Sequence, residues 1–125
     1  MAEREARYPG RAPIDAYGNG GFRFAEMSHR GSLLLLPSGI YAWAVDRFDD
    51  LVESDFARVF GEAGSIDFLL LGTGDHQRFP SAAIREAFAA AGVGLEVMGT
   101  GAACRTYNVL LAEQRAVAAA LIAVA

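Results

Sequence analysis

The sequence IDFLLLGTGDH at residues 66–76 decides the fold, because it joins an apolar strand to a glycine-rich turn. The run that begins it is short and apolar, as in a buried strand, and Gly72 and Gly74 follow where that run ends. The pattern returns as LEVMGTGAAC at residues 95–104. Two strand ends of one kind, this close in the chain, predict two units of the same α/β sheet.

The residues between and after the two Gly-Thr-Gly (GTG) turns have helical signals. Pro80 stands where a helix can begin and Gly92 where one can end, so we expect a helix over residues 81–91. A strand over residues 94–98 and a helix over residues 102–113 follow. The short connections predict a right-handed parallel βαβ unit.

Two hairpin signals precede this unit. Residues 17–21 form a glycine-rich turn between extended pieces at 14–16 and 22–27. Further on, Pro-Ser-Gly separates the apolar runs 31–36 and 40–45. Antiparallel strands added to a parallel unit make the predicted sheet mixed.

The remaining segments are predicted less sharply. Residues 46–64 have helical periodicity, with Asp49 or Asp50 as the first cap. The apolar run 116–124 fits either a buried helix or a covered strand. We expect residues 1–13 to form an extended or flexible arm and residues 14–125 to form a single α/β domain.

The GTG turns do not match the dinucleotide-binding fingerprint. That motif needs a third glycine in G-x-G-x-x-G, but Gln77 and Cys104 occupy the third position in the two turns. The helix after the first turn also begins too late to cradle a phosphate. The sequence therefore predicts no nucleotide cofactor, and the glycines are interpreted as requirements of tight strand exits.

Strand ends that are parallel neighbours open at the same edge of a sheet, which is where open α/β sheets bind ligands. The chemical groups near the two turns would then share one candidate ligand rim, formed by Thr73, Asp75, His76, Thr100, Cys104, Arg105 and Asn108. Backbone N–H groups at a helix start, helped by Arg105, would favour a small anion. One hypothesis is therefore a small-molecule or anion-binding domain, with a reaction at the rim left open.

Cys104 has two interpretations. Near a helix start its thiol could be acidic, with His76 as a base, or it could be a small buried apolar residue. We favour the buried interpretation and assign no catalytic residue. Because the chain has one cysteine and two histidines, we also expect no metal site.

Composition narrows the classes of partner. The chain has 125 residues and a net charge of −4, so it lacks the basic surplus that binds nucleic acid. All 11 basic residues are Arg, which is typical of a GC-rich bacterial genome. The N-terminus does not resemble a signal peptide, and the apolar run 116–125 is too short to span a membrane. These features predict a cytoplasmic protein.

Three longer pieces carry a family resemblance. They are SLLLLPSGIYAWAV, IDFLLLGTGDHQRFP and LEVMGTGAACRTYNVLLAEQR followed by AVAAALI. In this order they resemble the domain family of unknown function that includes mitochondrial respiratory complex I assembly factor 3. The resemblance covers roughly residues 14–124. It departs from the family pattern at Gln114, where many relatives have Gly, which predicts a strained turn or a longer helix there.

The resemblance implies both a fold and a role. The implied fold has three layers around a mixed sheet, with an antiparallel terminal strand over residues 116–123. The implied role is that of a non-enzymatic factor that binds a protein partner and is related to respiratory-complex assembly. The family supplies no catalytic residues to transfer to this chain.

Overall fold

The computed structural model describes residues 6–125. The strands in that range are β1 (Ala16–Gly18), β2 (Gly21–Phe24), β3 (Met27–Arg30), β4 (Ser32–Leu36), β5 (Gly39–Trp43), β6 (Phe68–Gly72), β7 (Gly94–Met98) and β8 (Val117–Leu121). The α-helices are α1 (Ala57–Gly61), α2 (Ala82–Ala91) and α3 (Thr100–Ala112). Short 3₁₀ turns are η1 (Phe48–Asp50), η2 (Glu53–Phe56) and η3 (Ala63–Ser65).

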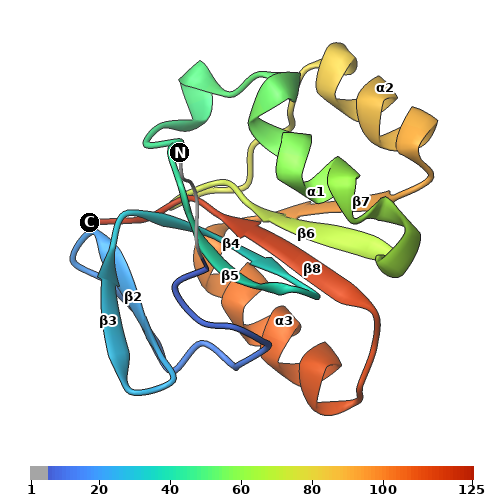
Figure 1. Cartoon of the computed structure of the whole chain (residues 1–125). Coiled ribbons are helices and arrows are strands. Elements are labelled where there is room, and N and C mark those ends of the chain that lie inside the picture. The colour runs from blue at the N-terminus through green and yellow to red at the C-terminus, as the bar shows by residue number, and fades with distance from the viewer. Residues whose placement is uncertain (1–5) are drawn as a thin grey trace.

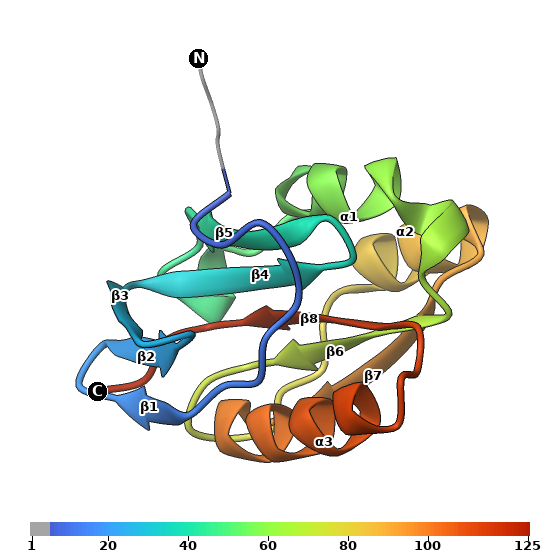
Figure 2. The same ribbon diagram turned by 60° about the horizontal axis from the view of Figure 1, so that its bottom comes forward.

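Helices cover both faces of a central mixed sheet. Its strand order is β5-β4-β8-β6-β7, with α1 and α2 on one face and α3 on the other (Figure 1). A separate antiparallel sheet of order β1-β2-β3 lies beside the start of α3 (Figure 2). The predicted α/β class, with three layers around a mixed sheet, is confirmed.

The terminal strand β8 joins the two halves of the sheet. It runs antiparallel to β4 and parallel to β6, so it is antiparallel only toward the N-terminal half. Every residue of β8 is buried, which explains why its sequence has no alternation of apolar and polar residues. The implied strand at the end of the chain is confirmed, and β6, α2 and β7 form the predicted parallel βαβ unit.

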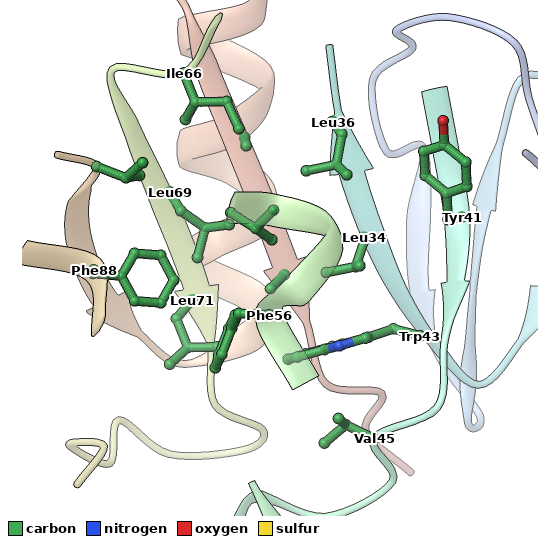
Figure 3. Packing of buried hydrophobic residues seen from close by; sticks show 14 of the residues in the cluster. Leu34, Leu36, Tyr41, Trp43, Val45, Phe56, Ile66, Leu69, Leu71 and Phe88 are labelled. Carbon is green, nitrogen blue, oxygen red and sulfur yellow. The ribbon is translucent and has the colours of Figure 1, made fainter. Parts of the chain in front are cut away.

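Alternation along the strands divides the core between the two faces. In β4, Leu34 and Leu36 pack toward α1 and α2, whereas Leu33 and Leu35 pack toward α3. On the first face Trp43, Phe56 and Phe88 form the aromatic centre visible in Figure 3. The ring centroids of Trp43 and Phe56 are 5.5 Å apart, and those of Phe56 and Phe88 are 5.0 Å apart.

The strand predicted over residues 22–27 is wrong in extent. β2 ends at Phe24, and a tight turn through Ala25 and Glu26 starts a second hairpin that continues in β3. Both turn residues have positive φ, 49° and 63°, as a mirror-image hairpin turn requires. Such turns are usually recognised by Asn or Gly, so an Ala-Glu pair leaves no signal in the sequence.

The continuous helix predicted over residues 46–64 is also wrong. The segment breaks into η1, η2, α1 and η3, and the backbone at Leu51 and Val52 is extended. The Trp43 indole N–H donates to the carbonyl of Asp55 at 2.8 Å. This bond holds the interrupted segment against the core residue Trp43. The Asp55 carboxylate accepts from the Val52 N–H at 2.9 Å, whereas η1 has no side-chain cap from Asp49 or Asp50 within the described range.

Part of the predicted N-terminal arm lies against the sheet. Tyr8 forms an antiparallel bridge to Ile40 of β5, and Ala12 is buried against the α3 side of the core. Residues 1–5 of the predicted arm lie outside the described residues.

Candidate functional site

The two GTG turns lie together at the carboxyl ends of β6 and β7. The Thr73 N–H donates to the Met98 carbonyl at 2.9 Å, and the Thr100 N–H donates to the Gly74 carbonyl at 2.8 Å. The Gly74 N–H in turn donates to the Thr100 hydroxyl at 2.9 Å. These three bonds join the turns into one unit at the edge of the sheet.

Both threonines of the turns are buried and hold backbone groups. The Thr73 hydroxyl donates to the His76 carbonyl at 2.6 Å and accepts from the Arg78 N–H at 3.1 Å. The Thr100 hydroxyl donates to the Ile122 carbonyl at 2.7 Å, which connects the turns to the end of β8. Each hydroxyl therefore serves the backbone and is not presented to solvent.

A hollow of about 450 Å³ opens above the turns, and we refer to it as the GTG hollow. Its side chains include Asp75, His76 and Arg105, all of them exposed. Gly99 and Gly101 form part of its floor where α3 begins, and Gly99 provides no side-chain cap. The partial positive charge of the helix start and the Arg105 guanidinium would attract an anion, while the nearby Asp75 carboxylate would repel it.

Cys104 lies on the inner side of α3, with 3% of its surface exposed. Burial raises the pKa of its thiol to about 12, and the nearby Arg105 offsets only part of that effect. The thiolate needed for nucleophilic attack is therefore scarce at neutral pH. Within residues 6–125 this thiol forms no hydrogen bond with His76, and the structure favours the buried interpretation.

Asn108 lies away from the GTG hollow and clamps the N-terminal segment to α3. Its side-chain oxygen accepts from the Ile14 N–H at 2.8 Å, and its side-chain nitrogen donates to the Ile14 carbonyl at 2.8 Å. A single amide thus replaces the two partners that a neighbouring strand would offer. Of the seven predicted rim residues, the structure brings only Asp75, His76 and Arg105 to the hollow with exposed side chains.

Sequence reasoning missed Tyr17 as a part of the GTG hollow. Its hydroxyl lies so close to Gly101 that a β-carbon at this glycine would collide with it. This explains the second glycine of the second turn by close packing and not by phosphate binding. A contact between residues so far apart in the chain has no sequence signal.

A second missed feature is an apolar groove between α2 and β7. We call it the β7 groove; it has a volume of about 630 Å³, and its apolar lining includes Phe79, Phe88, Val93, Leu95 and Val97. Phe79 is 69% exposed, the highest value among the exposed large apolar residues of the described chain. An aromatic residue directly before the helix start at Pro80 and Ser81 was the available signal.

Residues 6–125 contain neither a cluster of metal-binding side chains nor a helix suited to crossing a membrane. In this range no three or more His, Cys, Asp or Glu side chains come together as a possible metal site. In the same residues no helix combines the length and apolar character that crossing a membrane requires.

Comparison with known proteins places the chain in a family. A family model described as a protein of unknown function (DUF498/DUF598) matches residues 14–122. The chain belongs to this family. A DUF498/DUF598 relative is an uncharacterised protein of Rhodobacter capsulatus, which is 42% identical over 98% of this chain and 93% of its own length.

Two other matches show how far the DUF498/DUF598 domain extends. Human NADH dehydrogenase [ubiquinone] 1 alpha subcomplex assembly factor 3 is 32% identical over 87% of this chain, which spans 59% of the human protein. A crystal structure described as an outer membrane protein from Bartonella henselae is 50% identical, with a TM-score of 0.92. That match covers 95% of this chain and 100% of the Bartonella chain. The predicted family resemblance is confirmed.

Proposed function

We propose that this DUF498/DUF598 protein is a non-enzymatic, protein-binding factor that acts in the assembly of a respiratory complex. We propose that it is bacterial and acts in the cytoplasm. The observation that carries the proposal is the 32% identity to human assembly factor 3 over 109 residues. A similarity of that length extends over the whole domain and is not limited to a local motif. Because this domain spans 59% of the human protein, the proposal concerns the shared domain.

The chemistry of the GTG turns supports binding over covalent catalysis. The Thr73 and Thr100 hydroxyls already have backbone partners, and the Cys104 thiol is buried with a raised pKa. The strongest exposed apolar feature, Phe79, lies elsewhere, in the β7 groove. The apolar lining of this groove continues beyond Phe79, and contiguous exposed apolar surface of this kind is typical of sites that bind proteins or ligands.

The proposal is tested by cross-linking in the native cells. The full chain carries an affinity tag, is cross-linked in growing cells and is recovered under denaturing conditions, and its partners are identified by mass spectrometry. We expect subunits of a respiratory NADH dehydrogenase to be enriched over a tagged unrelated protein of similar size. Enrichment equal to that of the unrelated protein would remove the support for an assembly role.

Binding of a small anion in the GTG hollow is a second candidate, favoured by the position of Arg105 beside the uncapped start of α3. Inorganic phosphate and a series of small carboxylates are the probes in a thermal-melting titration. An anion bound there should stabilise the wild type, and the variant Arg105→Gln should lose most of that shift. A shift retained by this variant would place the anion elsewhere. Cys104→Ala, a buried change on the same helix, is the matched control.

A further inference from the structure

The central sheet has two edge strands, and the described chain covers only one of them. At β5, the Arg7 N–H donates to the Ile40 carbonyl at 2.6 Å, and the Ile40 N–H donates to the Tyr8 carbonyl at 3.0 Å. At the other edge, β7 pairs with β6 on one side and with no strand of residues 6–125 on its other side. An uncovered edge offers main-chain groups to an added strand.

The hydrogen-bond pattern shows which groups of β7 are free. The Gly94 N–H donates to the Asp67 carbonyl, and the Met98 carbonyl accepts from the Thr73 N–H, so these residues face β6. Because pairing alternates along a strand, Leu95 and Val97 direct their N–H and C=O groups away from β6. The main-chain groups of Leu95 and Val97 can therefore form hydrogen bonds with the backbone of a neighbouring strand.

The side chain of Gln77 already forms one of the hydrogen bonds that an added strand would form with β7. The Gln77 side-chain amide donates to the Val97 carbonyl at 2.9 Å, and Gln77 itself is exposed. An N–H of an added strand would bind that carbonyl from the same direction. An incoming strand could therefore displace the Gln77 side chain from the Val97 carbonyl. The Leu95 N–H and C=O are available without any displacement.

The β7 groove lies on the face of the strand that Leu95 and Val97 occupy. Leu95 packs against the α2 side of the core, and Phe79 forms an exposed wall of the groove. A strand added at the edge would direct every second side chain into this groove. Main-chain bonds would then supply affinity, and the groove would select apolar residues at alternate positions.

Charge disfavours the pairing with a second copy of this chain that would use both outward-facing residues of each β7. An antiparallel pairing that bonds Leu95 of one copy to Val97 of the other, and the reverse, places the two Glu96 side chains directly opposite each other. Like charges in directly opposed positions destabilise a strand pair. Glu96 is exposed and forms no ion pair within residues 6–125, so a basic residue of the incoming strand would complement it.

We propose that β7 binds an extended segment of a different protein as an added strand, with apolar residues at alternate positions and Lys or Arg opposite Glu96. This inference rests on the proposed protein-binding function and names the site and the chemistry of the partner.

The probe is the acetylated and amidated peptide TVRVRVT, titrated into the full chain and followed by two-dimensional NMR. We expect shifts centred on Gln77, Leu95 and Val97, and at least a tenfold slowing of amide exchange at Leu95 and Val97. The same peptide with alternate backbone nitrogens methylated on its pairing edge loses those donors and should not bind. Equal binding of the methylated peptide, or shifts that centre elsewhere, would overturn the inference.

Variants test the groove and the charge separately. Phe79→Ser should weaken binding about tenfold, since an exposed aromatic anchor contributes strongly to such contacts. Val109→Ser is the matched control, because Val109 is a 58% exposed apolar residue on α3, and it should leave binding unchanged. Glu96→Lys should reverse the preference toward the peptide TVEVEVT. Equal effects of the Phe79 and Val109 changes would overturn the assignment to this groove.

Cross-linking in cells separates this inference from the proposed function. If wild type and Phe79→Ser capture NADH dehydrogenase subunits equally, the assembly role stands and the β7 site is refuted. If wild type captures no such subunit while the peptide binds β7, the site stands and the assembly role fails. A wild-type dimer that Phe79→Ser converts to a monomer would refute the choice of a different protein as the occupant.

Discussion

Single polar side chains hold the carboxyl end of the sheet together. Thr100 is fully buried, and its hydroxyl joins the Gly74 N–H to the Ile122 carbonyl, so one residue connects the first turn to the end of β8. Asn108 does the same for the N-terminal segment through its two bonds to Ile14. Removing one partner of a buried bond costs about 1–3 kcal/mol, because the other is left unsatisfied.

Cys104 is expected to be unreactive in the native protein. The folded-state pKa of about 12 lies above the 9.0 of an unburied thiol, so the folded state binds the proton more tightly. Stability linked to this group is therefore fully present below pH 9 and is lost as the pH rises toward 12. At pH 8 a disulfide reagent for thiols should react on the order of a hundredfold more slowly with native protein than with urea-unfolded protein.

An exposed cysteine on the same helix provides the control for this measurement. Val109→Cys in a Cys104→Ala background places a thiol at a position where valine is 58% exposed. It should react rapidly in the native state. Rapid native reaction of Cys104 itself would contradict the burial argument.

Gln114 follows α3 with a φ of 60°, in the left-handed region that favours glycine. The Arg115 N–H donates to the Leu110 carbonyl and the Gln114 N–H to the Leu111 carbonyl, which is the Schellman arrangement of a helix end. The predicted strained turn is therefore present. We expect Gln114→Gly to raise the free energy of unfolding by about 0.5–1 kcal/mol, since relief of strain exceeds the entropy lost by glycine.

The neighbouring residue supplies the matched change. Glu113 has a φ of −88°, where glycine gains nothing, so Glu113→Gly should lower the free energy of unfolding by about 0.5–1 kcal/mol. Urea unfolding of both variants gives the comparison. Destabilisation by both changes would show that φ at Gln114 is not strained.

At the scale of elements, the GTG turns are close-packed strand exits. A β-carbon at Gly72 would lie 3.0 Å from the Thr100 Cα and 3.0 Å from a Leu121 methyl group. At Gly101 it would collide with the Tyr17 hydroxyl. These glycines let β6 and α3 approach each other and the neighbouring strands, which is why the motif occurs without a nucleotide-binding third glycine.

Gly72→Ala should destabilise the protein by about 1–3 kcal/mol, because the Thr100 backbone cannot move away easily. Gly61→Ala is the matched control, since none of the described atoms outside its own surroundings lies within 4 Å of the added carbon. That change sits at the end of α1 and should be neutral or stabilise by up to about 1 kcal/mol. Equal unfolding midpoints for the two variants in urea would contradict the packing explanation.

Elements were predictable where local patterns coincided with tertiary structure. β6, α2, β7 and α3 carry apolar periodicity with Pro and Gly at their ends, so both their type and order followed from the sequence. The break inside residues 46–64 depends on the bond from Trp43 to Asp55, a tertiary contact that local periodicity does not contain. The hairpin at Ala25 and Glu26 escaped detection because neither residue favours positive φ.

The sequence predicted where the candidate site lies, but not which of its side chains are exposed. Parallel neighbouring strands place both turns at one edge, and this followed from the pattern alone. Whether Thr100 or Cys104 faces the solvent depends on the rotation of α3 over the sheet, which packing decides. The β7 groove depends on which strand ends the sheet, and β8 takes the centre although it is last in the chain.

At the scale of the whole molecule, the order of strands predicts a gradient of stability across the central sheet. β8 is paired on both sides, and each of its residues is buried. β7 is paired on one side only, and its residues are exposed or half-buried. Amide groups in central strands open only with global unfolding, whereas outward-facing amides at an edge exchange directly with water.

Hydrogen exchange of the isolated protein measures this gradient. We expect the amides of Ala118, Ala119 and Ala120 to exchange at least on the order of a thousandfold more slowly than those of Leu95 and Val97. Glu96 provides the internal control: it lies on the same strand with its N–H toward β6, so its exchange should be slower than that of either neighbour. If Leu95 and Val97 exchanged as slowly as Glu96 in a monomer, the edge of β7 would already be covered. An added strand would then have no free main-chain donors to bind.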